Sequence, residues 1–269
     1  MSFSHSKVET HHTCPYKYKL RYVDKLEPKP DLRPSNALYI GTAVHEGIEH
    51  RSIEKAFESY KSNYPEISKE NELELYKIKK MLEVAIPQIP EGIYEFKIRD
   101  EDGFIGFIDM LVEVEPGVYD LYDFKTSNSA SRYKQSTQVH VYKYYYEKLT
   151  GHKVRNLYYA MVPKSTVKLE ECESYEDAIQ KVDKFFENKN ITFVNVVPER
   201  AKVGYFFARK NAMDVSDRDK NYTKMYSTMC KFCEYQKYCS TNGADRSELL
   251  RKSQNLKRWS YSNESNIIL

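Results

Sequence analysis

Two carboxylates and one amine stand in a stretch that otherwise has the composition of a buried β-hairpin. The stretch GFIGFIDMLVEVEPGVYDLYDFKTSNS (103–129) places Asp109 on its first strand and Asp123 and Lys125 on its second. Side chains alternate along a strand, so Asp123 and Lys125 share a face. Two carboxylates are oxygen ligands suited to Mg²⁺ or Mn²⁺, and a lysine beside them could position a water or offset transition-state charge. The pattern indicates a divalent-metal site for phosphodiester hydrolysis.

A solvent-exposed hairpin with an Asp–Lys ion pair is the alternative interpretation. The apolar runs FIGFI and LY that flank the charges favour a central position in a sheet instead. Burial of a carboxylate is costly unless it is paired or bound to a metal.

The turn of this hairpin sets a geometric condition on a shared metal. If Pro116 and Gly117 formed a plain two-residue turn, Asp109 would face Phe124 and would lie on the opposite side of the sheet from Asp123. We therefore expect either a loop of odd length or a β-bulge that shifts the register by one residue.

The surrounding elements predict one α/β unit with a helical insertion at 41–90. Apolar spacing predicts helices over 35–61 and 68–86, the second ended by prolines, and further helices over 129–151 and 174–190. Strand-like segments cover 92–100, the hairpin and 153–163, and KVGYFFARK (202–210) is predicted as a late strand.

Composition narrows the class of protein. The 269 residues carry 42 basic and 39 acidic side chains, a balance that does not indicate a nucleic-acid binder but permits a local basic groove. No apolar run approaches the roughly 18 residues of a membrane span, and the N-terminus lacks an apolar signal region. We expect a cytoplasmic protein without membrane association, whose cysteines are metal ligands or free thiols rather than disulfides.

Four of the five cysteines have the spacing of metal ligands. Cys230, Cys233 and Cys239 form a C-x₂-C-x₅-C cluster, and Cys14 stands far upstream, whereas Cys172 is isolated and is expected to be a free thiol. Four thiolates can hold Zn²⁺ or a [4Fe–4S] cluster. Such a link between the chain ends would restrict the unfolded chain by about 4–5 kcal/mol and couple metal binding to folding.

Together these motifs resemble the PD-(D/E)XK nuclease superfamily, and within it the RecB/AddB-like exonuclease branch. The superfamily signature is an acid on one strand and a (D/E)-x-K triplet on the next, matched by Asp109 and by Asp123-Phe124-Lys125, although Ile108 stands where a proline is expected.

Further matches lie in the helices and at the chain ends. The branch carries a metal-binding histidine after G-x-x-x, matched by His45 of GTAVHEGIEH, and a Q-x-x-x-Y motif that contacts DNA or orients the lysine, matched by Gln138 and Tyr142 of QVHVY. Glu95 stands on the preceding strand, where relatives often carry another acid. One cysteine near the N-terminus, in the sequence CPYKY, and three near the C-terminal end resemble the iron–sulfur staple of these enzymes and of related CRISPR-associated nucleases.

The resemblance implies a fold, a metal and a function. The fold is a restriction-endonuclease-like core with a mixed central sheet flanked by helices. A single nuclease domain is expected over 1–245, with its catalytic core at 91–210 and a tail at 246–269. Asp109, Asp123, His45 and the Phe124 carbonyl would bind Mg²⁺ or Mn²⁺, Lys125 would serve the attacking water, and a [4Fe–4S] cluster is favoured over zinc at the four cysteines.

The implied activity is a DNA exonuclease in repair, recombination or genome processing. Lys17 and Arg21, in a tyrosine-rich stretch, are expected to bind phosphates. No G-x-x-x-x-G-K-[ST] loop occurs, so unwinding requires a helicase or recombination partner, or a substrate with free or single-stranded ends. The alternatives are a non-catalytic DNA-binding adaptor that retains the fold and a redox-responsive iron–sulfur regulator.

Overall fold

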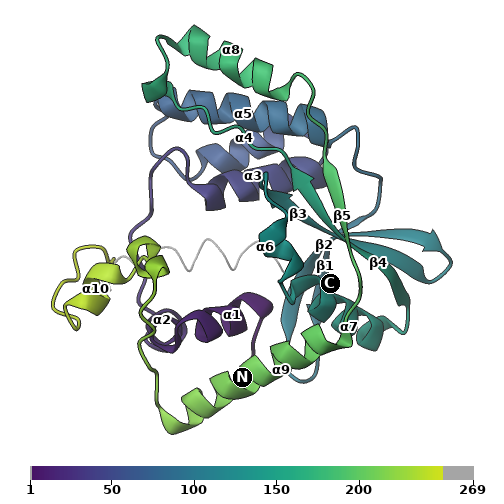
Figure 1. Cartoon of the computed structure of the whole chain (residues 1–269), viewed down its shortest axis with the longest axis vertical. Helices are drawn as coiled ribbons and strands as arrows, with labels where there is room; N and C mark the ends of the chain where they lie inside the picture. The colour runs from purple at the N-terminus through teal and green to yellow at the C-terminus, as the bar shows by residue number, and fades with distance from the viewer. Residues whose placement is uncertain (1, 251–269) are drawn as a thin grey trace. The chain divides into compact units, whose positions relative to one another are not determined.

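The computed structural model describes residues 2–250, and these form two compact units (Figure 1). Within the described residues, the sheet unit comprises 2–3 and 32–206, and the terminal unit comprises 4–31 and 207–250. The predicted tail at 246–269 lies outside the described residues from 251 onward. No helix among the described residues is long and apolar enough to cross a membrane.

A five-stranded mixed sheet forms the centre of the sheet unit, which confirms the predicted fold class. Its strands follow the chain in the order β1-β2-β3-β4-β5, and only β3 and β4 run parallel. A parallel pair requires a crossover, and a helix between β3 and β4 supplies it. The strands are β1 Ile93–Arg99, β2 Ile105–Glu115, β3 Val118–Thr126, β4 Lys153–Val162 and β5 Thr192–Val196.

Four helices that include the predicted insertion share one apolar core with the sheet (Figure 1), and two of them, α3 and α5, contact its strands. The helix predicted over 35–61 is interrupted near Arg51, whose φ is 48°, and the helix predicted over 68–86 starts at a capping box of Ser68 and Asn71. The helices bury their apolar sides in a core that also contains Met110 and Phe124 of the sheet. They are α3 Ala37–Glu49, α4 Ile53–Lys61, α5 Lys69–Ala85 and α8 Tyr175–Phe186.

The crossover helix α7, Gln138–Thr150, follows the short helix α6, Ser131–Lys134, and contacts strands β1 to β4. Its buried Tyr146 packs edge-on against Phe96 of β1 and Tyr119 of β3. Gly151 ends α7 with a left-handed φ of 73°, as its glycine predicted. Helix α7 thus lies across strands β1 to β4, and its first residue, Gln138, comes twelve residues after the end of β3.

One predicted strand is wrong and one strand was not predicted. The segment 202–210 lies inside helix α9, Arg200–Asp219, where the buried Phe206 and Met213 are seven residues apart, as two turns of a helix require. The run Tyr205-Phe206-Phe207 gave it the composition of a strand, but Tyr205 is exposed. Strand β5 escaped prediction because only Val196 of its five residues is buried.

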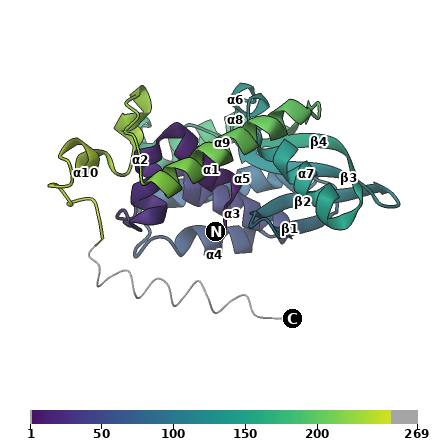
Figure 2. The same ribbon diagram turned by 90° about the horizontal axis from the view of Figure 1, so that it is seen from below.

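The terminal unit joins the two ends of the described chain (Figure 2). Helix α1 is held to the last part of α9 by hydrogen bonds from Arg209 to Glu9 (2.6 Å) and between His11 and Ser216 (2.9 Å). Its other elements are α2 Pro15–Tyr18, the π-helix η1 Lys19–Val23, the 3₁₀ helix η3 Thr228–Phe232 and α10 Gln236–Ser240, while α1 spans His5–Thr13. Segments from both ends of the described chain thus form one packed unit.

Candidate metal centre and cysteine pocket

A β-bulge places the two predicted aspartates opposite each other. Glu115 pairs with Val118 across the turn, but the register shifts by one residue between Glu113 and Glu115. Continued along the strands, the shifted register sets Asp109 directly opposite Asp123. The predicted register shift is confirmed, and a bulge rather than a longer loop produces it.

The two carboxylates are buried and lack sufficient partners within the protein. Asp123 has a side chain only 1% exposed, and apart from the Lys125 ammonium neither of its oxygens has a hydrogen-bond partner among the described residues. Asp109 accepts one hydrogen bond, from the Phe124 N–H at 2.7 Å. Burial, together with the neighbouring Asp123, raises the pKa of Asp109 well above its usual value. Facing buried carboxylates of this kind fit a divalent cation.

The amine of Lys125 is the nearest positive charge to this pair. Its Nζ atom lies 2.5 Å from Asp123 Oδ2 and forms an ion pair. Burial by itself would lower the pKa of Lys125, but Asp123 and then Asp109 raise it overall, so the side chain stays protonated. One ammonium thus faces two carboxyl groups, and a divalent cation would favour the ionised form of both.

Three polar or aromatic side chains surround the Lys125 ammonium: Tyr133 of α6, Gln138 of α7 and Tyr159 of β4. Gln138 Oε1 accepts from Nζ at 3.3 Å, and Gln138 Nε2 donates to Tyr142 at 3.4 Å. The rings of Tyr133 and Tyr159 lie 5.7 and 5.9 Å from Nζ, within reach of a cation–π interaction. The structure therefore brings the predicted Gln138 and Tyr142 to the lysine, and adds two tyrosines that the motif did not indicate.

His45 reaches the same centre from helix α3. Its Nε2 lies 3.0 Å from the Phe124 carbonyl oxygen, and its Nδ1 lies 3.7 Å from Asp109 Oδ2. Burial lowers the pKa of His45 despite the nearby Asp123, so the imidazole is neutral at pH 7. A neutral imidazole beside a carbonyl and a carboxylate is a competent metal ligand.

Glu95 completes a triad of ligand atoms with His45 and Asp109, all within 4.8 Å of one another. In the β1–β2 register it stands opposite Asp109, and its φ of 49° is unusual for a residue other than glycine. Burial and then Asp109 and Glu49 raise the pKa of Glu95 to about 7. The strand position of Glu95 was evident in the sequence, but its left-handed backbone was not.

Two further glutamates carry no motif and were not predicted from the sequence. Glu46 and Glu49 line a hollow of about 470 Å³ together with His45 and Glu95. Glu49 is four residues after His45, so the shared helix face was a readable signal. These side chains make the approach to the centre strongly acidic.

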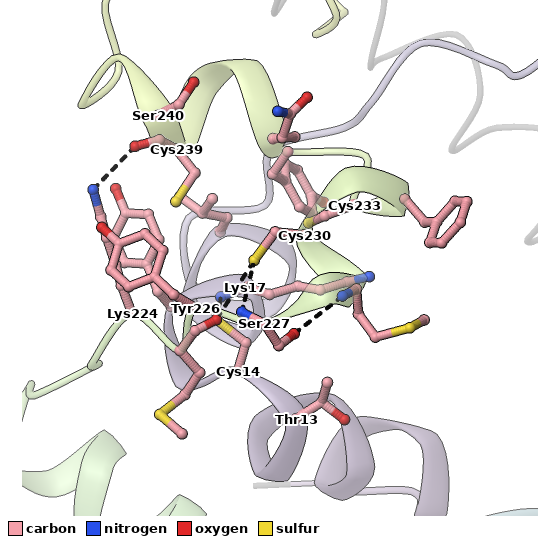
Figure 3. A pocket seen from close by; sticks show the side chains of 17 residues that line it. Thr13, Cys14, Lys17, Lys224, Tyr226, Ser227, Cys230, Cys233, Cys239 and Ser240 are labelled. Carbon is pink, nitrogen blue, oxygen red and sulfur yellow. Dashed lines mark hydrogen bonds between the residues drawn. The ribbon is translucent and has the colours of Figure 1, made fainter.

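The four cysteines with metal-ligand spacing lie together in the terminal unit. Figure 3 shows Cys14, Cys230, Cys233 and Cys239 lining one pocket of about 320 Å³, whereas Cys172 belongs to the sheet unit. Burial raises the pKa of the Cys233 and Cys239 thiols. Among the described residues, no three of these sulfur atoms lie within 4.8 Å of one another.

Both basic residues predicted to bind phosphates lie close to the Glu234 carboxylate, next to the cysteine pocket. Lys17 lines the pocket and forms an ion pair with Glu234 at 2.7 Å. Arg21 lies 3.8 Å from the same carboxylate and stacks over Tyr22, with half of its side chain exposed. Of the two, Arg21 is the more accessible to a ligand.

The family model of the PD-(D/E)XK nuclease superfamily matches residues 2–240. The chain belongs to this superfamily. Comparison with curated proteins gives no match. Eight chains of solved structures match, among them one titled "Crystal structure of SSO0001", with 11% identity and a TM-score of 0.33 over 91% of this chain and 94% of that one.

Membership in the PD-(D/E)XK nuclease superfamily implies nuclease chemistry on DNA with a divalent metal. The residues that could hold such an ion here are the carboxylates of Asp109 and Asp123, the imidazole of His45 and the main-chain carbonyl of Phe124. A bound ion would polarise a phosphoryl oxygen and lower the pKa of an attacking water. The protein's own part is to hold these ligands and to keep the Lys125 ammonium beside them.

Proposed function

We propose that this protein is a metal-dependent DNA exonuclease of the RecB/AddB-like branch, using Mg²⁺ or Mn²⁺. The observation that carries the proposal is the bulge in β2, which sets Asp109 opposite Asp123 with Lys125 alongside. His45 and the Phe124 carbonyl complete the proposed ligand set.

Each remaining residue has a role in this proposal that follows from its contacts. The Lys125 ammonium positions the attacking water or offsets negative charge that develops on the phosphoryl oxygens. The Gln138 side-chain oxygen accepts a hydrogen bond from that ammonium, and the Gln138 side-chain NH₂ donates one to the Tyr142 hydroxyl, which orients the amide. A non-catalytic adaptor would have no use for two facing buried carboxylates, which cost stability unless a cation balances them.

The substrate in this proposal is DNA with free or single-stranded ends, on which the enzyme acts with a helicase or recombination partner where duplex must be opened. Arg21 and Lys17 are proposed to contact phosphates. We further propose that residues 1–245 act as one nuclease module.

A [4Fe–4S] cluster is proposed at Cys14, Cys230, Cys233 and Cys239. All four thiols line one pocket, and one upstream cysteine with three near the end of the described chain differs from the two C-x₂-C pairs that zinc ribbons usually supply. Four thiolates of this kind can each bind one iron atom of a cluster. It would link the two ends of the chain and so stabilise the folded state.

The test is cleavage of labelled DNA by anaerobically purified protein with Mn²⁺, Mg²⁺ or chelator. We expect linear DNA to be shortened only with metal, and Asp123→Asn to lose more than about 100-fold in rate. Asp120→Asn is the matched control, because Asp120 is also buried on β3 but is paired with Arg155.

Two results would overturn the proposal in different ways. Absence of cleavage with either metal, or full activity of Asp123→Asn, would remove the nuclease assignment. Cleavage of closed circular DNA at the rate of linear DNA would replace the exonuclease with an endonuclease.

A further inference from the structure

An apolar stretch of the terminal unit is exposed to solvent. Within the 220–233 segment, four side chains that line the rim of the cysteine pocket, Met225, Tyr226, Met229 and Phe232, have exposed fractions of 51%, 80%, 60% and 71%. Four large apolar side chains exposed within eight residues are too concentrated to be incidental surface residues. Such a concentration marks an interaction surface.

The same segment carries only positive charge. Lys220, Lys224 and Lys231 fall within it, and no aspartate or glutamate occurs between 220 and 233. The Lys231 ammonium lies 4.9 Å from the ring centroid of Phe232, so charge and aromatic surface are presented together. The electrostatic complement of this segment is a polyanion.

We propose that the 220–233 segment binds single-stranded DNA, with bases stacked on Tyr226 and Phe232 and phosphates beside Lys220 and Lys231. The inference rests on the proposed DNA substrate and names the surface that selects unpaired strands. Bases in a duplex are already stacked and paired, whereas unpaired bases offer both faces to an aromatic ring. A protein partner fits less well, because lysine is depleted in the cores of protein interfaces.

The segment is fixed in place by its link to the cysteine pocket. Figure 3 shows Tyr226 and Cys230 on the wall of that pocket, and the Cys230 thiol faces the Met225 carbonyl oxygen at 3.7 Å. Lys224 donates to the Cys239 carbonyl at 3.0 Å. Anchoring at both positions limits the freedom that the exposed side chains lose on binding, which favours affinity.

The test measures DNA binding separately from cleavage, in the Asp123→Asn background. Fluorescence anisotropy would compare a labelled oligothymidylate with a hairpin duplex of equal charge. We expect Tyr226→Ala and Phe232→Ala each to weaken single-strand affinity about tenfold, with little change for the duplex, and Tyr226→Phe to retain affinity.

Two further variants complete the design. Lys231→Ala should weaken binding and reduce the salt dependence of log affinity by about 0.7. Tyr205→Ala is the control, because Tyr205 is 61% exposed and lies outside the segment. Unchanged visible absorbance and melting temperature would show that each variant keeps the pocket intact.

The proposal is overturned if Tyr226→Ala and Phe232→Ala bind the oligothymidylate like the parent, or if both DNA forms lose affinity equally. It is also overturned if the variants change self-association in sedimentation instead of DNA affinity. Failure of the nuclease assignment would be seen separately, as absence of metal-dependent cleavage by the wild-type protein while the single-strand preference persists.

Discussion

Replacing Lys125 by methionine tests whether the centre is held together by charge. The substitution keeps most of the side-chain volume and removes the ammonium that lies 2.5 Å from Asp123. Asp123 is then left 1% exposed with no hydrogen bond to either oxygen. In metal-free protein nothing else among the described residues contacts that carboxylate closely enough to replace the lysine.

The expected loss of stability follows from this burial. At an effective dielectric constant of 20, charges 2.5 Å apart attract by about 6–7 kcal/mol, but the loss is capped because the carboxyl group can take up a proton. Protonating an ordinary aspartic acid costs about 4 kcal/mol at pH 7 and about 1.5 kcal/mol at pH 5. We therefore expect Lys125→Met to lower the free energy of unfolding by about these amounts, as for other broken buried pairs.

The sign of the pH dependence is a separate check. In the variant, the folded state binds a proton that the unfolded state releases, so stability falls as the pH rises. Urea unfolding of chelator-treated protein, followed by circular dichroism at pH 5 and pH 7, measures both values. Equal losses at the two pH values would refute the reasoning.

Two companion variants make this result specific. Lys143→Met removes an ammonium that is also 2.5 Å from its partner, but Glu147 is 33% exposed, so the loss should stay below about 1 kcal/mol. Adding Asp123→Asn to Lys125→Met should recover most of the stability, because no buried charge remains. A double variant as unstable as Lys125→Met would show that lost packing, and not charge, caused the effect.

Three other expectations use the same protein. Asp109→Asn should stabilise the metal-free protein increasingly from pH 5 to pH 8 in thermal melts, because burial and Asp123 raise the pKa of Asp109 and make its ionisation costly in the folded state; a constant difference would contradict this. Tyr159→Phe should keep stability within about 1 kcal/mol and retain cleavage, since the buried hydroxyl lacks a well-aligned partner, whereas Tyr159→Leu should slow cleavage severalfold by removing the ring near the lysine. Cys230→Ser should bleach visible absorbance and lower the melting temperature while Cys172→Ser does neither, and a colourless wild-type protein with one zinc per chain would refute the cluster.

The geometry of the hairpin was predictable because strands alternate strictly. Asp109 and Asp123 can share an ion only in one register, so the alternation of side chains by itself requires a shift. Which device supplies the shift was not predictable, since Val114 at the bulge is an ordinary strand residue. The left-handed φ of Glu95 was not predictable either, because a glutamate in a strand gives no local signal for that backbone conformation.

Elements near the end of the sheet unit were harder to predict than the centre. The segment around Tyr205 has an aromatic composition that favours a strand and outweighs its periodicity, although Phe206 and Met213 carry the helical spacing. Strand β5 lies at the edge of the sheet and pairs only with β4, so burial left little pattern in its sequence. Strand β1 also has only one buried residue, yet it was predicted because Tyr94, Phe96 and Ile98 alternate along it.

Phe124 shows how the fold positions the centre with few residues. Its ring is 2% exposed in the core shared with helices α3 and α5, and it meets the His45 ring edge-on at 5.7 Å. Its backbone N–H donates to Asp109, and its carbonyl lies 3.0 Å from His45 Nε2. Because alternation sends the side chains of Asp123 and Lys125 to the opposite face, this apolar residue fixes the strand in the core while its main chain orders the acidic centre. The apolar residue between the two charges of the D-x-K triplet is therefore part of the site.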